Sequence, residues 1–179
     1  MKIYVAVALF LVLLTFGYWF YEDNRQINQL KAGEVLPIDA KTTVRESQLV
    51  HLTHGEHQVE QTGISIGDVY GTQEAMYFGI WYNRWNAFHQ EDKQWDRTDH
   101  VVNYYVTAKD EQGNLYQGET LSYSKGTFEI FQYVKLQGVH DIASIEELEF
   151  IFYPKKSTET ARELKPSATP LFSTGVKIR

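Results

Sequence analysis

Three histidines lie close together in the stretch HLTHGEH, at His51, His54 and His57. Neutral imidazole nitrogens bind zinc at about 2.0–2.1 Å, and three such ligands leave a fourth position open for water. Histidines three apart point to opposite faces of a strand, and Gly55 interrupts any helix, so only a loop would bring the rings together. The stretch therefore predicts a candidate metal site, with a solvated polar turn or a pH-sensitive contact as the alternatives.

A second unusual feature is a cluster of aromatic side chains in the window IWYNRWNAFHQEDKQW. Exposed aromatic rings stack on sugars or anchor protein partners, because they supply a large rigid area. The alternative is that the first tryptophan packs between two sheets and the others cover an open end. The candidate binding residues of this aromatic set are Trp81, Tyr82, Trp85, Phe88 and Trp95.

Other chemistry finds little support in the residues. The chain has no cysteine, which excludes a disulfide, a thiolate metal site and a cysteine nucleophile. No nucleotide-binding motif, nucleophile elbow or EF-hand loop occurs, so we expect no cofactor and no enzyme activity. A surface hydrolase, assisted by a metal in the histidine loop or by Glu91 and Asp92, is the enzymatic alternative. With 17 Lys and Arg against 23 Asp and Glu, the chain also lacks the basic surface that nucleic acid requires.

The N-terminal segment predicts where these residues are held. Ile3 to Phe20 is a run of eighteen residues without a charge, which as a helix would span roughly 27 Å, close to a bilayer core. Its end is aromatic, whereas a cleaved signal peptide needs small side chains there. Lys2 on one side and Glu22 and Asp23 on the other predict a cytoplasmic N-terminus and an extracytoplasmic domain.

Three parts follow from this division. Residues 1–21 are predicted to form a transmembrane signal anchor, residues 22–33 a helical stem that Gly33 ends, and residues 34–179 an extracytoplasmic domain. In that domain the apolar period changes from helical to alternating. Strands are expected at residues 44–52, 63–70, 74–82, 100–109, 115–120, 127–136, 147–153 and 171–178, with Pro154 ending the seventh.

About eight strands with turns between them favour a mainly β, two-sheet antiparallel sandwich. The runs from Gly63 to Tyr82, from Val101 to Gly118 (VVNYYVTAKDEQGNLYQG) and from Glu147 to Pro154 (ELEFIFYP) carry a family likeness. They resemble immunoglobulin-like extracytoplasmic domains of bacterial single-pass membrane proteins. That resemblance implies a fold and a location, and no functional residues.

The function expected from the sequence is that of an integral, single-pass membrane protein whose outer domain binds a protein or a cell-surface component, as an accessory or sensing subunit. The alternatives are a glycan-binding module that uses the aromatic set, and the surface hydrolase. No nucleic-acid partner is expected.

Overall fold

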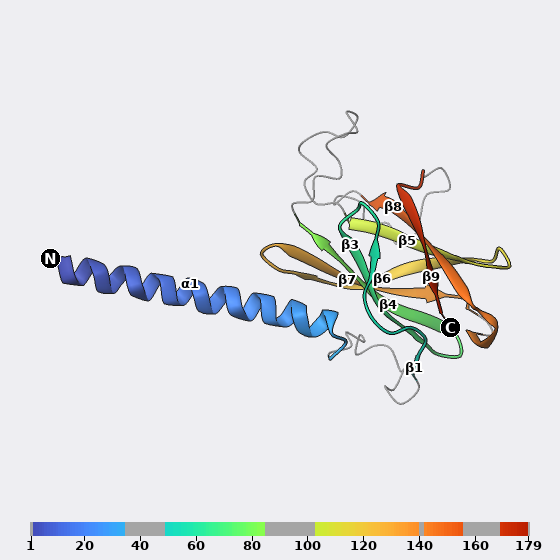
Figure 1. The fold of residues 1–179 in the computed structure, drawn as a ribbon, viewed down its shortest axis with the longest axis horizontal. Coiled ribbons are helices and arrows are strands. Elements are labelled where there is room, and N and C mark those ends of the chain that lie inside the picture. The colour runs from blue at the N-terminus through green and yellow to red at the C-terminus, as the bar shows by residue number, and fades with distance from the viewer. Residues whose placement is uncertain (1, 35–48, 85–102, 140–141, 156–168, 179) are drawn as a thin grey trace.

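A computed structural model describes residues 2–34, 49–84, 103–139, 142–155 and 169–178. A long helix, α1 (Lys2–Lys31), projects from a β domain and, among the described residues, contacts it through its C-terminal part, from Phe20 onward (Figure 1). In the described part of the chain the strands are β1 (Val50–His51), β2 (His57–Val59), β3 (Ile64–Gly71), β4 (Ala75–Asn83), β5 (Asn103–Asp110), β6 (Leu115–Lys125), β7 (Glu129–Gln137), β8 (Glu147–Lys155) and β9 (Phe172–Lys177). A 3-10 helix (Ile142–Ser144) precedes β8.

All these strands belong to one antiparallel sheet with the order β1-β3-β4-β7-β6-β5-β8-β9, and β2 pairs with β3 next to β1. The sheet curls on itself because β6 belongs to both halves. Residues 118–125 of β6 pair with β7, whereas residues 115–117 pair with β5. The curl brings β4 opposite β8, where the rings of Phe78 and Phe150 meet edge to face with centroids 4.8 Å apart.

The predicted mainly β architecture behind a long apolar helix is confirmed. The predicted immunoglobulin-like sandwich needs a correction, because the described strands form one curled half-barrel sheet and not clearly two separate layers. The reason lies in β6, whose eleven residues are enough to hydrogen-bond to both halves. The sequence predicted only residues 115–120 as a strand there, and so missed residues 122–125, which continue the pairing with β7.

The inside of the curl holds the main core. It contains side chains from nearly every strand, including Ile66, Phe78, Val134, Phe150 and Val176, all buried. Alternate residues of β3, β4 and β7 point to the other side of the sheet, which we call the outer face. There a second apolar cluster, the outer cluster, consists of Ile27, Tyr70, Ala75, Tyr77, Trp81, Phe131 and Tyr133.

The strand β8 also departs from the prediction, because it continues through Pro154 to Lys155. Backbone groups of residues two apart point to the same side of a strand, and the carbonyl of Phe152 accepts a hydrogen bond from the amide of Leu171. The nitrogen of Pro154 therefore faces the same side, beyond Phe152 and Phe172, the last β8–β9 pair in the described residues. No ladder bond is lost there, so proline is tolerated.

The structure has a turn at residues 110–114, which joins β5 to β6 in a hairpin. The Asp110 carboxylate accepts hydrogen bonds from the amides of Gln112 and Asn114 and from the Tyr116 hydroxyl, the last at 2.7 Å. Burial opposes the charge on Asp110, but these donors outweigh it and lower the pKa of that carboxyl. The carboxylate thus holds the turn together.

Gly118 tests the account of the curl. A Cβ at this position would collide with the backbone carbonyl oxygen of Val106, at the point where β6 passes from one half of the sheet to the other. Gly118→Ala should therefore lower the free energy of unfolding by about 1–3 kcal/mol or more. Urea unfolding of the full chain in detergent, followed by circular dichroism, measures it. Gly175→Ala is the matched control, because a Cβ there meets only the movable carboxylate of Glu147, and a change within about 0.5 kcal/mol is expected.

Candidate functional site

The last turns of α1 lie against the outer face of the sheet. Ile27 is 4% exposed and packs in the outer cluster, with Leu30 beside it. These side chains cover β4, whose residues from Ala75 to Tyr82 are buried on both faces. We call this contact between helix and sheet the junction.

Two glycines make room for the aromatic rings under the helix. A Cβ on Gly67 would lie 2.9 Å from the indole of Trp81, and a Cβ on Gly79 would clash with the ring of Phe131. The two rings stack nearly parallel, at 6.2 Å between centroids and an angle of 10°. The glycines of β3 and β4 therefore let a flat aromatic layer form on which the helix end rests.

The helix ends where the junction ends. Gly33 has a φ of +68°, its amide donates to the carbonyl of Leu30, and the amide of Glu34 donates to the carbonyl of Gln29. This pair of bonds is the Schellman arrangement, in which glycine is favoured because it has no Cβ. A Cβ on Gly33 would also lie 2.6 Å from the Tyr70 hydroxyl.

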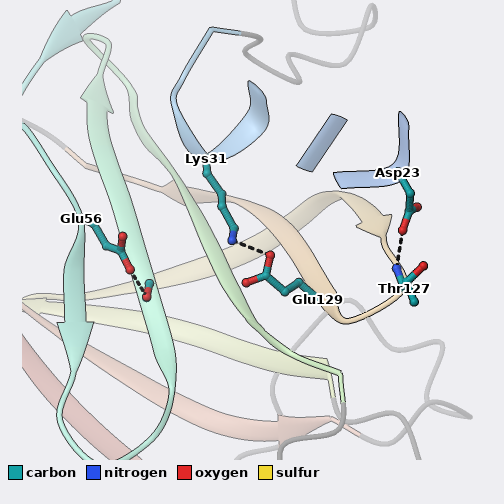
Figure 2. A network of polar contacts seen from close by, with 6 residues as sticks. Asp23, Lys31, Glu56, Thr127 and Glu129 are labelled. Atoms are coloured by element: carbon teal, nitrogen blue, oxygen red, sulfur yellow. Dashed lines mark hydrogen bonds and ion pairs between the residues drawn. The ribbon is translucent and has the colours of Figure 1, made fainter. Parts of the chain in front are cut away.

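Polar contacts flank the apolar ones. The Lys31 ammonium donates to a Glu129 carboxylate oxygen at 2.5 Å and lies 5.7 Å from the centre of the Trp81 ring. About two helical turns before Lys31, the Asp23 carboxylate accepts a hydrogen bond from the amide of Thr127, in the turn between β6 and β7, at 2.5 Å. Figure 2 shows the two contacts side by side, each joining α1 to the β6–β7 hairpin.

An open groove of about 370 Å³ runs beside the junction. Its lining carries both signs of charge, with Lys31 from the helix and Glu56 and Asp68 from the sheet side. Glu56 also accepts a hydrogen bond from the Ser65 hydroxyl at 2.5 Å, which fixes it on that wall (Figure 2). The remaining lining residues are Asn28, Ala32, Gly55, Gly67 and Trp81.

Next to this groove the structure brings together His51, His54 and Asp68. Each offers a ligand atom, and the three atoms lie within 4.8 Å of one another. The two imidazoles stack at 5.1 Å, and the ring of Tyr70 packs edge-on against His51 at 4.4 Å. Both histidines are exposed and Asp68 is half-buried, so water reaches the cluster.

Backbone geometry directs these three side chains to one point. Opposite Gly79, β3 has two residues where β4 has one, since Ile66 pairs with Ile80 and Val69 already with Phe78. Such a bulge re-aims a side chain, and it turns Asp68 away from the core. The loop after His51 returns at Gly55, whose φ is +98° and whose amide donates to the Asp68 carboxylate at 2.6 Å.

The predicted metal set of His51, His54 and His57 is thus only partly brought together. The loop does bring His51 and His54 into contact. His57 lies in β2 on the same side as Val59, which is buried in the core, so alternation turns this imidazole away from the other two. Asp68 takes the third position.

The aromatic set does not gather into one surface among its described members. Trp81 is 6% exposed and lies in the outer cluster, whereas Tyr82 is 4% exposed and lies in the main core. Neighbouring residues of a strand point to opposite faces, which is the physical reason. Trp85, Phe88 and Trp95, like Glu91 and Asp92, lie outside the described residues, so their role stays a prediction.

Sequence reasoning missed Asp68, Lys31 and Glu129. The signal for Asp68 was Gly67, because a glycine inside a strand pattern marks a bulge or a close approach. Lys31 and Glu129 are 98 positions apart, and their pairing depends on the docking of the helix.

Comparison with known proteins leaves the family open. No family model matches the sequence, and no curated protein is similar to it in sequence. One solved structure, that of a conserved domain protein from Bacillus anthracis, is similar with a TM-score of 0.41 and 14% identity. The similarity covers 70% of this chain, and this chain spans about half of that protein, 49%. A likeness this distant assigns neither family nor function.

The Lys31–Glu129 pair provides a test of the junction. Because the two side chains are only 21% and 34% exposed, Lys31→Met and Glu129→Gln should each lower the free energy of unfolding by roughly 1–3 kcal/mol. The double variant should lose less free energy of unfolding than the sum of the two single losses, and a double-mutant cycle measures this difference as the coupling energy of the pair. The exposed Glu22–Arg25 pair within α1, at 3.5 Å, is the control and should couple by no more than about 0.5 kcal/mol. Equal coupling in both pairs would contradict the docked junction.

Proposed function

We propose that the protein is a membrane-anchored binding module, with α1 as its single span, its N-terminus in the cytoplasm and its β domain outside. The observation that carries this proposal is the division of α1 into two parts. Large apolar side chains from Tyr4 to Tyr21 are exposed, among them Phe10 at 61% and Leu13 at 64%, whereas Ile27 is buried against the sheet.

A bilayer is the natural cover for the exposed part. Within the described residues, α1 is the one helix long and apolar enough to cross a membrane, a property that a signal sequence would share. An apolar cylinder of this length is unfavourable in water, and a helix satisfies its own backbone hydrogen bonds in lipid. The positive charge of Lys2 and the negative charges of Glu22 and Asp23 favour the orientation with Lys2 inside.

The junction favours retention of the helix after insertion. Phe128, in the turn between β6 and β7, meets Phe20 edge to face at 5.7 Å, just where the exposed apolar part ends. With the contacts of Asp23 and Lys31, this ring pair supports a fixed orientation of the β domain relative to the membrane. A domain held in this way presents the same groove to any partner in or near that membrane.

The groove beside the junction is the binding surface that we propose. It contains cationic, anionic and aromatic groups in one hollow, which suits a polar segment of a protein partner. The glycan-binding alternative depends on Trp85, Phe88 and Trp95, and the hydrolase alternative on a reactive group beside the histidine loop. No observation on the described residues favours either above the binding module.

Membrane topology can be tested by cysteine labelling, because the natural chain has no cysteine. In intact cells a membrane-impermeant maleimide should modify Gln73→Cys, which lies exposed in the turn between β3 and β4. It should leave unmodified a cysteine inserted between Met1 and Lys2, which keeps the charge of Lys2. Permeabilised cells should allow both reactions. Labelling of the inserted cysteine alone in intact cells would reverse the orientation, and release of the labelled β domain into the medium would show that the helix is cleaved.

The binding surface can be tested by site-specific photocrosslinking in cells. A photoreactive residue at Asn28, in the groove, should give a discrete crosslinked product that Lys31→Glu diminishes. The same residue at Leu115 is the control, since it is 59% exposed and lies in the β5–β6 hairpin, away from the helix (Figure 1). If Leu115 gave the same product, or if Asn28 gave none, the groove would not be the binding surface.

A further inference from the structure

We propose that His51, His54 and Asp68 form a binding site for a divalent transition-metal ion, and that zinc is the ion that fits it best. This inference does not depend on the membrane orientation or on the partner. It rests on the proximity of the three ligand atoms, on the backbone features that direct them, and on the chemistry of the donor set.

The three residues come from two separate stretches of the chain, which the sheet brings together. His51 is in β1, His54 is in the loop after it, and Asp68 is in the bulge of β3. The register between β1 and β3 places His51 directly opposite Tyr70, two residues beyond Asp68. The strands themselves therefore set the distance between the first histidine and the carboxylate.

The groups around the ligands hold them in place. The amide of Gly55 binds one oxygen of Asp68 at 2.6 Å, and the Tyr70 hydroxyl lies 3.5 Å from the other. Hydrogen bonds to a ligating carboxylate orient it and tune metal affinity.

The donor set selects the class of metal. Two imidazoles and one carboxylate suit zinc and related transition metals, whereas calcium and magnesium prefer a shell of oxygens alone. Three protein ligands leave a coordination position for water or for a group of a bound partner. Because both histidines are exposed, that position would face solvent beside the groove.

A metal here would also brace the junction. It would tie β1 and the histidine loop to β3, and Tyr70, which touches His51, lies directly beneath Gly33 at the end of α1. The loop that carries Gly55 and Glu56 forms one wall of the groove, so metal binding would fix this wall.

Isothermal titration of the full chain in detergent micelles, purified without a histidine tag, tests the site with zinc chloride as the probe. We expect one zinc per chain with micromolar affinity. His51→Ala, His54→Ala and Asp68→Asn should each weaken binding by more than about tenfold, since even residues outside the ligand shell alter affinity by about 10–100-fold. His57→Ala is the matched control, because it removes the nearby histidine at the start of β2 that lies outside the cluster, and its affinity should equal that of the natural chain.

Nuclear magnetic resonance of the histidine rings provides a second readout that needs no substitution. Zinc should shift the ring nitrogen signals of His51 and His54 and leave those of His57 in place. Absence of saturable binding at micromolar zinc would overturn the proposal, and so would a loss of affinity in His57→Ala equal to that in His51→Ala. Unchanged binding in Asp68→Asn would remove Asp68 from the site. Circular dichroism of each variant separates loss of a ligand from loss of the fold.

Discussion

The packing of the last turns of α1 on the outer face of the sheet is the contact on which the rest of the structure depends. A sheet strand that is apolar on both faces must be covered on both, and β4 is such a strand. The curl of the sheet covers one face of β4. Ile27 and Leu30 help to cover the other, over an aromatic layer that Gly67 and Gly79 make room for. Removal of the helix end would expose Trp81 and Phe131 to water.

This contact also brings together the features that could carry function. The groove, the histidine loop and the bulge of β3 all lie beside the end of α1, and Tyr70 contacts both His51 and the position of Gly33. If α1 spans the membrane as we propose, the junction would fix the position of the β domain relative to the bilayer. The charged contacts of Lys31 and Asp23 with the β6–β7 hairpin orient the helix on an otherwise apolar interface (Figure 2). We therefore regard the junction as the structural basis of the proposed module.

Much of the fold was predictable from local patterns. The apolar alternation in residues 100–109, 127–136 and 147–153 specifies strands whichever sheet they join, and the Asp110 turn carries its own hydrogen-bond donors. The single curled sheet, found in place of the predicted immunoglobulin-like sandwich, was not predictable in the same way, because the length of β6 and its two sets of partners depend on tertiary pairing. The candidate site also has a part that the local sequence predicts and a part that depends on tertiary structure. A loop that joins His51 and His54 follows from Gly55, whereas the replacement of His57 by Asp68 follows from a bulge and from the side on which β2 packs. Lys31 and Glu129 meet only after the helix has docked.

The most direct test of the central claim is a distance measurement across the junction in a lipid environment. Because the natural chain has no cysteine, spin labels can be placed at Gln26→Cys on α1 and Gln137→Cys at the end of β7, both exposed. Double electron–electron resonance in lipid nanodiscs should then give a single narrow distance distribution at the separation seen in the structure, and Ile27→Asp should broaden it. A broad distribution in the natural background would mean that the helix is a flexible stem and that the β domain is not held against it.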